Sequence, residues 1–150
     1  MTAFDLDLRH PQHISEVQTE YFPDMTAEEV MNKFNTMNWK QLQILMLQIP
    51  AGQATFTVTD NMLNQTVKIS LIELPQTEVL AFHFESDIEV EVEQKNLFGL
   101  LKYHRAMAVE LSHLSLKVTR ELLDAFTHQE LEVIKQHYLR NDQKILTSLK

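Results

Sequence analysis

A long segment of alternating residues constrains the fold of this chain more than any other feature. Between residues 78 and 93, six apolar side chains keep one phase throughout: Leu80, Phe82, Phe84, Ile88, Val90 and Val92. Alternation with a period of two is typical of a strand that has one face in the core. The segment therefore forms either one long strand or a hairpin that turns near Ser86. Because cross-strand partners share a face, we predict a hairpin whose three-residue loop, 85–87, pairs Phe84 with Ile88.

Weaker patterns predict the elements that precede this segment. Residues 41–49 are apolar enough to form a central strand, and alternation predicts further strands over 54–58 and 67–71. The sequence T-A-E-E at residues 26–29 is a capping-box pattern, and an apolar stripe follows it at helical spacing. We therefore predict a helix over 27–37.

After residue 95 the spacing of the apolar residues returns to that of a helix. Residues 97–113 carry leucines and His104 along one helical stripe, so we predict a helix with His104 buried against the sheet. Residues 115–126 predict a second helix. A further capping-box pattern, from Thr127 to Glu130, predicts that a third helix follows.

Together these elements predict a single α+β domain over residues 1–150. Residues 1–24 show no clear period, and we expect them to form an extended arm. Residues 26–93 are predicted to form a helix and an antiparallel meander sheet of four to five strands, and residues 96–150 to form about three helices. We expect the helices to pack on one face of the sheet.

The residue types that are missing or rare exclude several kinds of site. The chain has no cysteine, which excludes a thiolate zinc site, an iron–sulfur cluster and a cysteine nucleophile. Its two glycines are too few for a phosphate-binding loop or a dinucleotide fingerprint, and no nucleophile or zinc-protease motif is present. His10 and His13 lie in the predicted arm. We therefore expect no catalytic residue, no cofactor and no metal site.

The charge of the chain is acidic and unevenly distributed. There are 21 acidic and 13 basic residues, for a net charge of −8 with histidine neutral. Residues 1–93 hold 15 acids and 4 bases, whereas residues 94–150 hold 6 acids and 9 bases. An acidic chain disfavours general binding to nucleic acid or to an anionic membrane. Because no basic leader or long apolar run is present, we expect a cytoplasmic protein.

The most unusual pattern is a row of five alternating acids, which we call the acidic strip: Glu85, Asp87, Glu89, Glu91 and Glu93. In an extended strand these carboxylates share one face and lie about 6.8 Å apart, given a rise of about 3.4 Å per residue. Like charges repel and glutamate is a poor strand former, so the row carries a cost. His83 lies on the same face and opposes Glu89 in the predicted hairpin.

The acidic strip has three interpretations. It is a docking site for a cationic partner, or a solvated edge that resists pairing with other chains. Alternatively, nearby bases screen it within the chain: Lys95, Lys102 and Arg105. If Glu85 and Asp87 fall in the predicted turn, Glu89, Glu91 and Glu93 still share one face of the strand.

These observations favour a non-enzymatic protein-binding protein. The chain is similar in composition to bacterial toxin-immunity proteins and phage-type inhibitors. This similarity implies that the acidic strip and His83 bind a basic patch on a partner, such as a nuclease-type toxin or another nucleic-acid enzyme. One alternative is a secretion chaperone. Another is a ligand-binding or enzymatic α+β domain with a cavity between sheet and helices and with His104 or His83 at its mouth.

Overall fold

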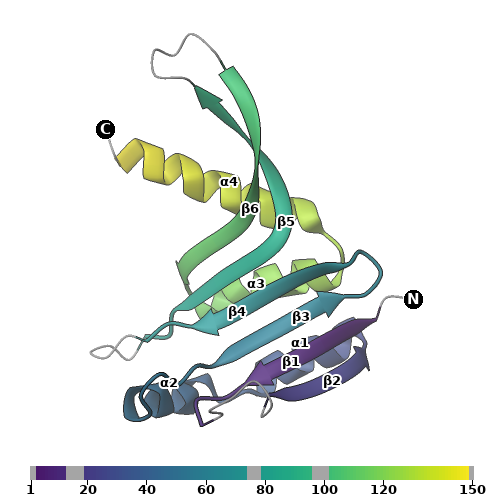
Figure 1. The fold of residues 1–150 in the computed structure, drawn as a ribbon, viewed down its shortest axis with the longest axis vertical. Coiled ribbons are helices and arrows are strands. Elements are labelled where there is room, and N and C mark those ends of the chain that lie inside the picture. The colour runs from purple at the N-terminus through teal and green to yellow at the C-terminus, as the bar shows by residue number, and fades with distance from the viewer. Residues whose placement is uncertain (1–2, 13–18, 74–78, 96–101, 149–150) are drawn as a thin grey trace.

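A computed structural model describes the backbone of residues 3–12, 19–73, 79–95 and 102–148, and their side chains except in 93–95, 102–104 and 142–148. This part of the chain has an α+β fold with six strands and four helices (Figure 1). The strands are β1 (Phe4–Arg9), β2 (Glu20–Met25), β3 (Thr55–Asp60), β4 (Gln65–Leu71), β5 (Phe82–Lys95) and β6 (Lys102–Leu114). The helices are α1 (Ala27–Thr36), α2 (Trp39–Gln48), α3 (Leu116–Thr127) and α4 (Leu131–Ser148).

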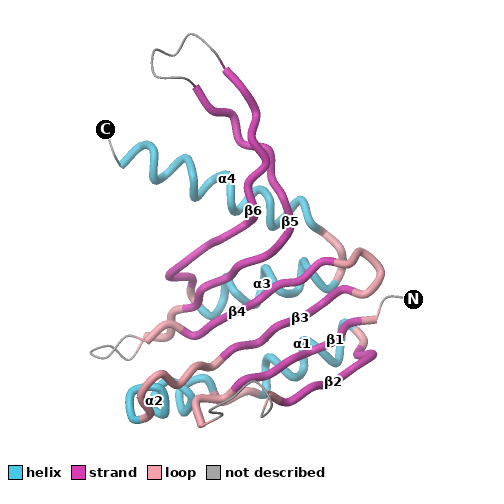
Figure 2. Tube along the Cα trace, in the orientation of Figure 1, coloured by secondary structure: helices cyan, strands magenta, loops and turns pink. Residues whose placement is uncertain are grey.

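The six strands form one antiparallel sheet in the order β2-β1-β3-β4-β5-β6. Helices α1 and α3 lie against one face, and the opposite face is open (Figure 2). Strands β5 and β6 continue beyond the other four as a two-stranded ribbon, which α4 crosses (Figure 1). The sheet therefore has more strands than the predicted four to five, because three strands lie in segments assigned to other structures: β1 and β2 in the predicted arm and β6 in a predicted helix.

The core lies between the sheet and the helical layer, and aromatic rings dominate its centre. The ring of Phe34 on α1 lies 5.2 Å from that of Trp39 on α2 and 5.3 Å from that of Phe56 on β3. Trp39 also meets Phe82 of β5 edge-on, at 5.2 Å. Aromatic pairs in such tilted and edge-to-face arrangements stabilise beyond the area they bury, by about 0.5–1.5 kcal/mol each. These rings join both N-terminal helices to the middle of the sheet.

The predicted N-terminal arm is wrong, because residues 4–9 and 20–25 are strands of the sheet. Phe4, Leu6 and Leu8 are fully buried and alternate with polar residues. Strand β1 pairs with both β2 and β3, so it lies inside the sheet, and its alternating apolar residues lie on the face that packs against the core. The alternating run of β1 was too short to stand out, and β2 contains Pro23, which is unusual within a strand.

The predicted strand over 41–49 is also wrong, because the segment lies largely in α2. The side chain of Asn38 accepts a hydrogen bond from the Gln41 backbone N–H and caps this helix. Leu42 and Met46 are buried with a spacing of four residues, whereas Ile44 remains 53 % exposed. An apolar run is compatible with either structure, and here the cap and the core contacts determine a helix.

The predicted hairpin at 85–87 is wrong, and the alternative of one long strand is correct. β5 passes through this point with a bulge, and the register with β6 shifts between Glu85 and Glu89. The hydroxyl of Ser86 donates to the Thr66 carbonyl oxygen at 2.8 Å, and a carboxylate oxygen of Asp87 accepts from the Thr66 N–H at 2.9 Å. The polar residues that suggested a turn therefore form hydrogen bonds between β5 and β4.

The predicted helix over 97–113 is replaced by β6 from Lys102 onward. Inward residues Val109 and Leu111 are buried, and they alternate with exposed Ala108 and Glu110. His104 lies in a strand opposite Glu93, and the burial predicted for its side chain falls outside the described side chains. Residues 97–101 also lie outside the described residues.

Two of the predicted helices, α1 and α3, begin at side-chain caps, and the cap of α1 is the predicted one. Thr26 and Glu29 form the complete capping box of α1, with both hydrogen bonds near 3 Å. The side chain of Ser115 caps α3 by accepting from the Val118 N–H. Thr127, in contrast, does not cap α4: it ends α3, and its hydroxyl donates to the Asp124 carbonyl oxygen.

A buried carboxylate connects the β3–β4 turn to the α3–α4 turn. Asp60 is fully buried, and one carboxylate oxygen accepts the backbone N–H groups of Met62 and Leu63 at 2.9 and 3.1 Å. The other oxygen accepts the side-chain amide of Gln129 at 3.1 Å. Gln129 itself has a positive φ of 59°. Two turns that are distant in sequence therefore depend on one side chain.

We predict that Asp60→Ala lowers the free energy of unfolding by about 3 kcal/mol, because three donors lose a charged acceptor at a buried site. Gln129→Ala, which removes only one of these bonds, is expected to cost about 1 kcal/mol. Urea unfolding monitored by Trp39 fluorescence measures both changes. Equal losses for the two variants would show that the two backbone bonds contribute nothing.

Candidate functional site

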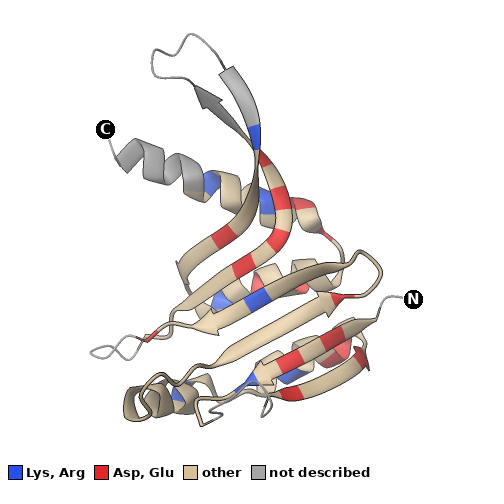
Figure 3. Ribbon diagram, in the orientation of Figure 1, with Lys and Arg blue, Asp and Glu red and all other residues tan. Residues whose placement is uncertain are grey.

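The open face of the sheet carries the polar residues that alternate with the core residues. It includes Asp5, Asp7 and Arg9 of β1, threonines of β3, Lys68 of β4, His83 and Glu85 of β5, and Glu110 of β6. Figure 3 shows that acidic residues outnumber basic ones on this face. We call this surface the acidic face. It is the candidate functional site.

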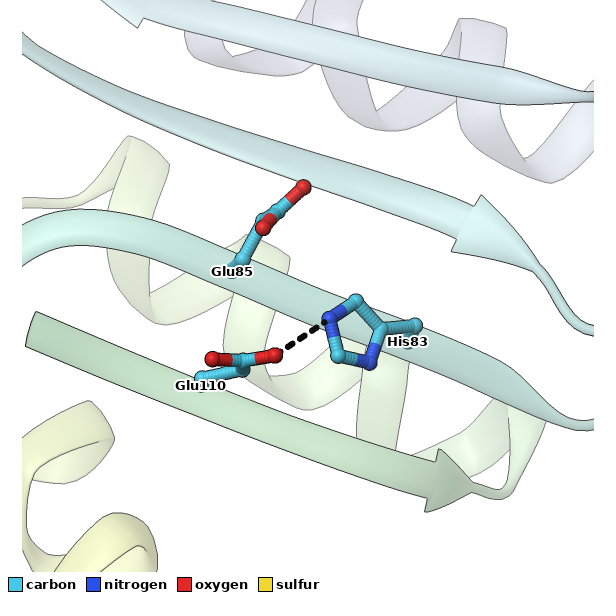
Figure 4. Close-up of side chains that lie close together, drawn as sticks. All are labelled: His83, Glu85 and Glu110. Carbon is cyan, nitrogen blue, oxygen red and sulfur yellow. Dashed lines mark ion pairs between the residues drawn. The ribbon is translucent and has the colours of Figure 1, made fainter.

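Glu85, the first residue of the acidic strip, lies in a cluster at the middle of β5 and β6. Glu85 and Glu110 are direct cross-strand partners, so two like charges oppose each other. His83 Nε2 lies 3.2 Å from Glu110 Oε1 (Figure 4), and Lys68 Nζ lies 3.9 Å from Glu85 Oε1. His83 therefore pairs with Glu110, and the expected contact with Glu89 is wrong because the hairpin does not form.

The remaining residues of the acidic strip do not form the even row expected for a regular strand. Asp87 lies in the bulge, where its carboxylate accepts the Thr66 N–H. Glu89 and Glu91 are exposed on the ribbon, as expected, and they lie opposite Ala108 and Ala106. Glu93 pairs in register with His104, and its side chain lies outside the described ones.

Two of the earlier interpretations of the acidic strip can be compared with the pairing. The described pairing of β4 with β5 stops at Ser86, so one edge of β5 extends past β4 along the ribbon. Glu89 and Glu91 lie beside that edge, which is compatible with protection against pairing with other chains. Arg105 opposes Val92, so the alternation places it on the other face of the ribbon from Glu91. It is therefore poorly placed to screen these carboxylates.

Sequence reasoning missed Lys68, Glu110 and the two aspartates of β1. Glu110 was assigned to a helix, and Asp5 and Asp7 to an arm. The alternation of Val109 and Leu111 with exposed residues was the available signal for Glu110. This alternation was not recognised, because the leucines of the segment also fit the spacing of a helix.

Asp5 and Asp7 are neighbours on β1 with opposite electrostatic environments. The Asp24 backbone N–H donates to Asp5 at 3.1 Å and, with side-chain hydrogen bonds from Asn61 and Tyr21, holds the pKa of Asp5 below its ordinary value of 3.8. Burial raises the pKa of Asp7 above 3.8, and the charge of Asp5 raises it further. The fold therefore stabilises one carboxylate and penalises the other.

We predict that Asp7→Asn raises the stability at neutral pH, whereas Asp5→Asn lowers it. A raised pKa means that ionised Asp7 costs stability above that pKa, and this cost disappears at pH values below 3.8, where the group is protonated in both states. The benefit from Asp5 is present above 3.8 and is lost as the pH falls through its lowered folded pKa. Thermal unfolding of both variants from pH 2 to pH 7 measures these changes. The same sign for both variants at pH 7 would contradict the assignment.

Two surface hollows bear on the alternative of a ligand cavity. One, of about 350 Å³, lies between β6 and α4 and is lined by His83, Glu110 and Tyr138, among others. The second, of about 310 Å³, lies where α1 and α2 meet the end of β1 and is lined by Lys33, Asn38 and Leu42, among others. His83 therefore lines a hollow at the sheet edge, and not one between the sheet and the α1–α3 layer.

No family model, curated protein or solved structure matches this chain. None of the helices in the described residues is long and apolar enough to cross a membrane. The candidate function therefore depends on the geometry and charge of the acidic face.

Proposed function

We propose that this chain is a non-enzymatic protein-binding protein whose acidic face covers a basic patch on a macromolecular partner. The observation that carries the proposal is a sheet with helices against one face and more acidic than basic residues on the other (Figure 3). Hydrogen-bonded strands fix the backbone positions of these residues before binding, which lowers the entropy lost on association. Such a surface is suited to inhibition by coverage and does not need a deep pocket.

The ribbon adds a feature that suits a concave partner. It projects from the sheet (Figure 1), and Glu89 and Glu91 are exposed on it opposite the small side chains of Ala108 and Ala106. A narrow projection with carboxylates along one face can enter a basic cleft, where charges on both sides are partly desolvated and attract more strongly than in water. Clefts of this charge are typical of enzymes that act on nucleic acid.

These considerations favour an inhibitor or immunity-type role, exerted in the cytoplasm on a nuclease-type toxin or another nucleic-acid enzyme. A secretion chaperone remains the second protein-binding candidate, and nothing in the geometry of the acidic face favours it. The ligand-binding alternative is less well supported, because aromatic rings fill the centre of the core between sheet and helices.

We predict that replacing Glu89, Glu91 and Glu93 together by glutamine leaves the melting temperature unchanged or slightly higher, because the repulsion among them is removed. The same variant is expected to associate with its partner about tenfold more slowly at low salt, and with a weaker salt dependence. Proteins recovered from a native lysate on immobilised wild-type chain are identified by mass spectrometry. Association rates of the purified partner are then measured from low to high salt.

The control variant removes the same number of charges from the helical layer, at Glu28, Glu121 and Glu130, which are all exposed. It is expected to bind the partner almost as fast as wild type, because its substitutions lie away from the acidic face. Equal association rates for the ribbon variant and wild type at low salt would overturn the proposed role of the ribbon. Equally slow association of both variants would show that the net charge of the chain, and not the acidic face, determines the association rate.

A further inference from the structure

His83, Glu85 and Glu110 bring three potential metal ligands together on the acidic face. His83 and Glu85 are two residues apart on β5 and share one face, and Glu110 is the cross-strand partner of Glu85. Their ligand atoms all lie within 4.8 Å of one another. Figure 4 shows His83 and Glu110 pointing toward each other, whereas the side chain of Glu85 points toward β4, where Lys68 lies. The sequence expectation of no metal site did not include this group, because it placed residue 110 on a helix.

The charges of this cluster are poorly balanced within the chain. Glu85 and Glu110 oppose each other directly, which destabilises a strand pair unless a cation lies between them. The Lys68 ammonium is 3.9 Å from Glu85, and both side chains are 45 % exposed, so this pair contributes little. A divalent cation between the two carboxylates would neutralise both charges.

The donor set indicates the class of ion. One imidazole nitrogen and two carboxylate oxygens suit zinc and similar divalent transition metals, whereas calcium and magnesium prefer oxygen ligands alone. Zinc bonds of about 2.0–2.2 Å place tetrahedral ligand atoms roughly 3.4 Å apart. The 3.2 Å between His83 Nε2 and Glu110 Oε1 is already close to this value. Glu85 has to approach by a side-chain rotation, which its partial exposure permits.

The surroundings leave room for the ion and its remaining ligands. A hollow of about 350 Å³ lies on the His83 and Glu110 side of the cluster, and one of about 310 Å³ lies on the Glu85 side. The three residues project from paired strands, so the backbone positions of the ligands are fixed before binding. Three protein ligands with an open position for water is an arrangement that zinc accepts.

We propose that His83, Glu85 and Glu110 form a binding site for one divalent transition metal ion of the zinc class. The site bridges β5 and β6 at the point where the ribbon leaves the sheet. This inference does not depend on the proposed function, because it follows from the geometry of the three side chains.

The experiment titrates zinc chloride into the untagged full chain by calorimetry and follows cobalt chloride binding by visible absorption. We expect one ion per chain for wild type. Zinc affinity is expected to fall by more than about tenfold in each of three variants, His83→Asn, Glu85→Gln and Glu110→Gln. A loss of about tenfold is already typical when a residue that only supports a metal ligand is replaced. The matched control is Glu89→Gln, which removes one charge from the same strand outside the cluster and is expected to bind like wild type.

A measurement on the wild-type chain alone guards against variants that fail to fold. Paramagnetic cobalt is expected to broaden the amide resonances of residues 83–85 and 110 first. Broadening centred elsewhere, for example around His10, would overturn the proposal. Unchanged zinc affinity in folded His83→Asn and Glu110→Gln, or no binding at millimolar zinc, would overturn it as well.

Discussion

The pairing of β5 with β6 is the constraint on which the other features depend. Residues 102–114 have a helical spacing of apolar residues, but they form a strand because they pair with β5, which is long and has an apolar inner face. Two irregularities adjust the pairing. One extra residue on β6 is accommodated near His113, which has a positive φ of 57°, and two extra residues lie on β5 between Glu85 and Glu89. An even insertion preserves the phase of the strand, so Ile88 stays buried and Glu89 stays exposed.

The parts of the fold that were predictable are those with local physical causes. The capping box at Thr26 and the alternation over 54–58 and 67–71 predicted α1, β3 and β4, since each signal acts within a few residues. The segments 41–49 and 97–113 carry apolar residues at spacings that fit more than one structure. In the first segment the Asn38 cap and the aromatic rings around Trp39 decide for a helix, and in the second the pairing with β5 decides for a strand.

The candidate site was predictable in composition and not in arrangement. The strip of acids on β5 is visible in the sequence, and it does lie on the solvent side of the strand where its side chains are described. The acids are not evenly spaced, because the side chains of Ser86 and Asp87 form hydrogen bonds with Thr66 near the start of β4. Glu110 could not be placed without the register of β6, so the cluster around His83 had no counterpart in sequence reasoning.

The acidic side chains of the sheet divide into two groups by what the fold does with their charge. Asp5, Asp60 and Asp87 accept backbone N–H groups, so their ionisation supports turns and strand ends. Glu85 opposes another carboxylate, and Glu89 opposes an alanine. Their cross-strand partners therefore do not stabilise the charges of these two side chains. Glu85 and Glu89 lie on either side of Asp87 along β5. A cation held at Glu85 would therefore weaken the field that a basic partner meets at the base of the ribbon, which places the two proposed binding events in competition.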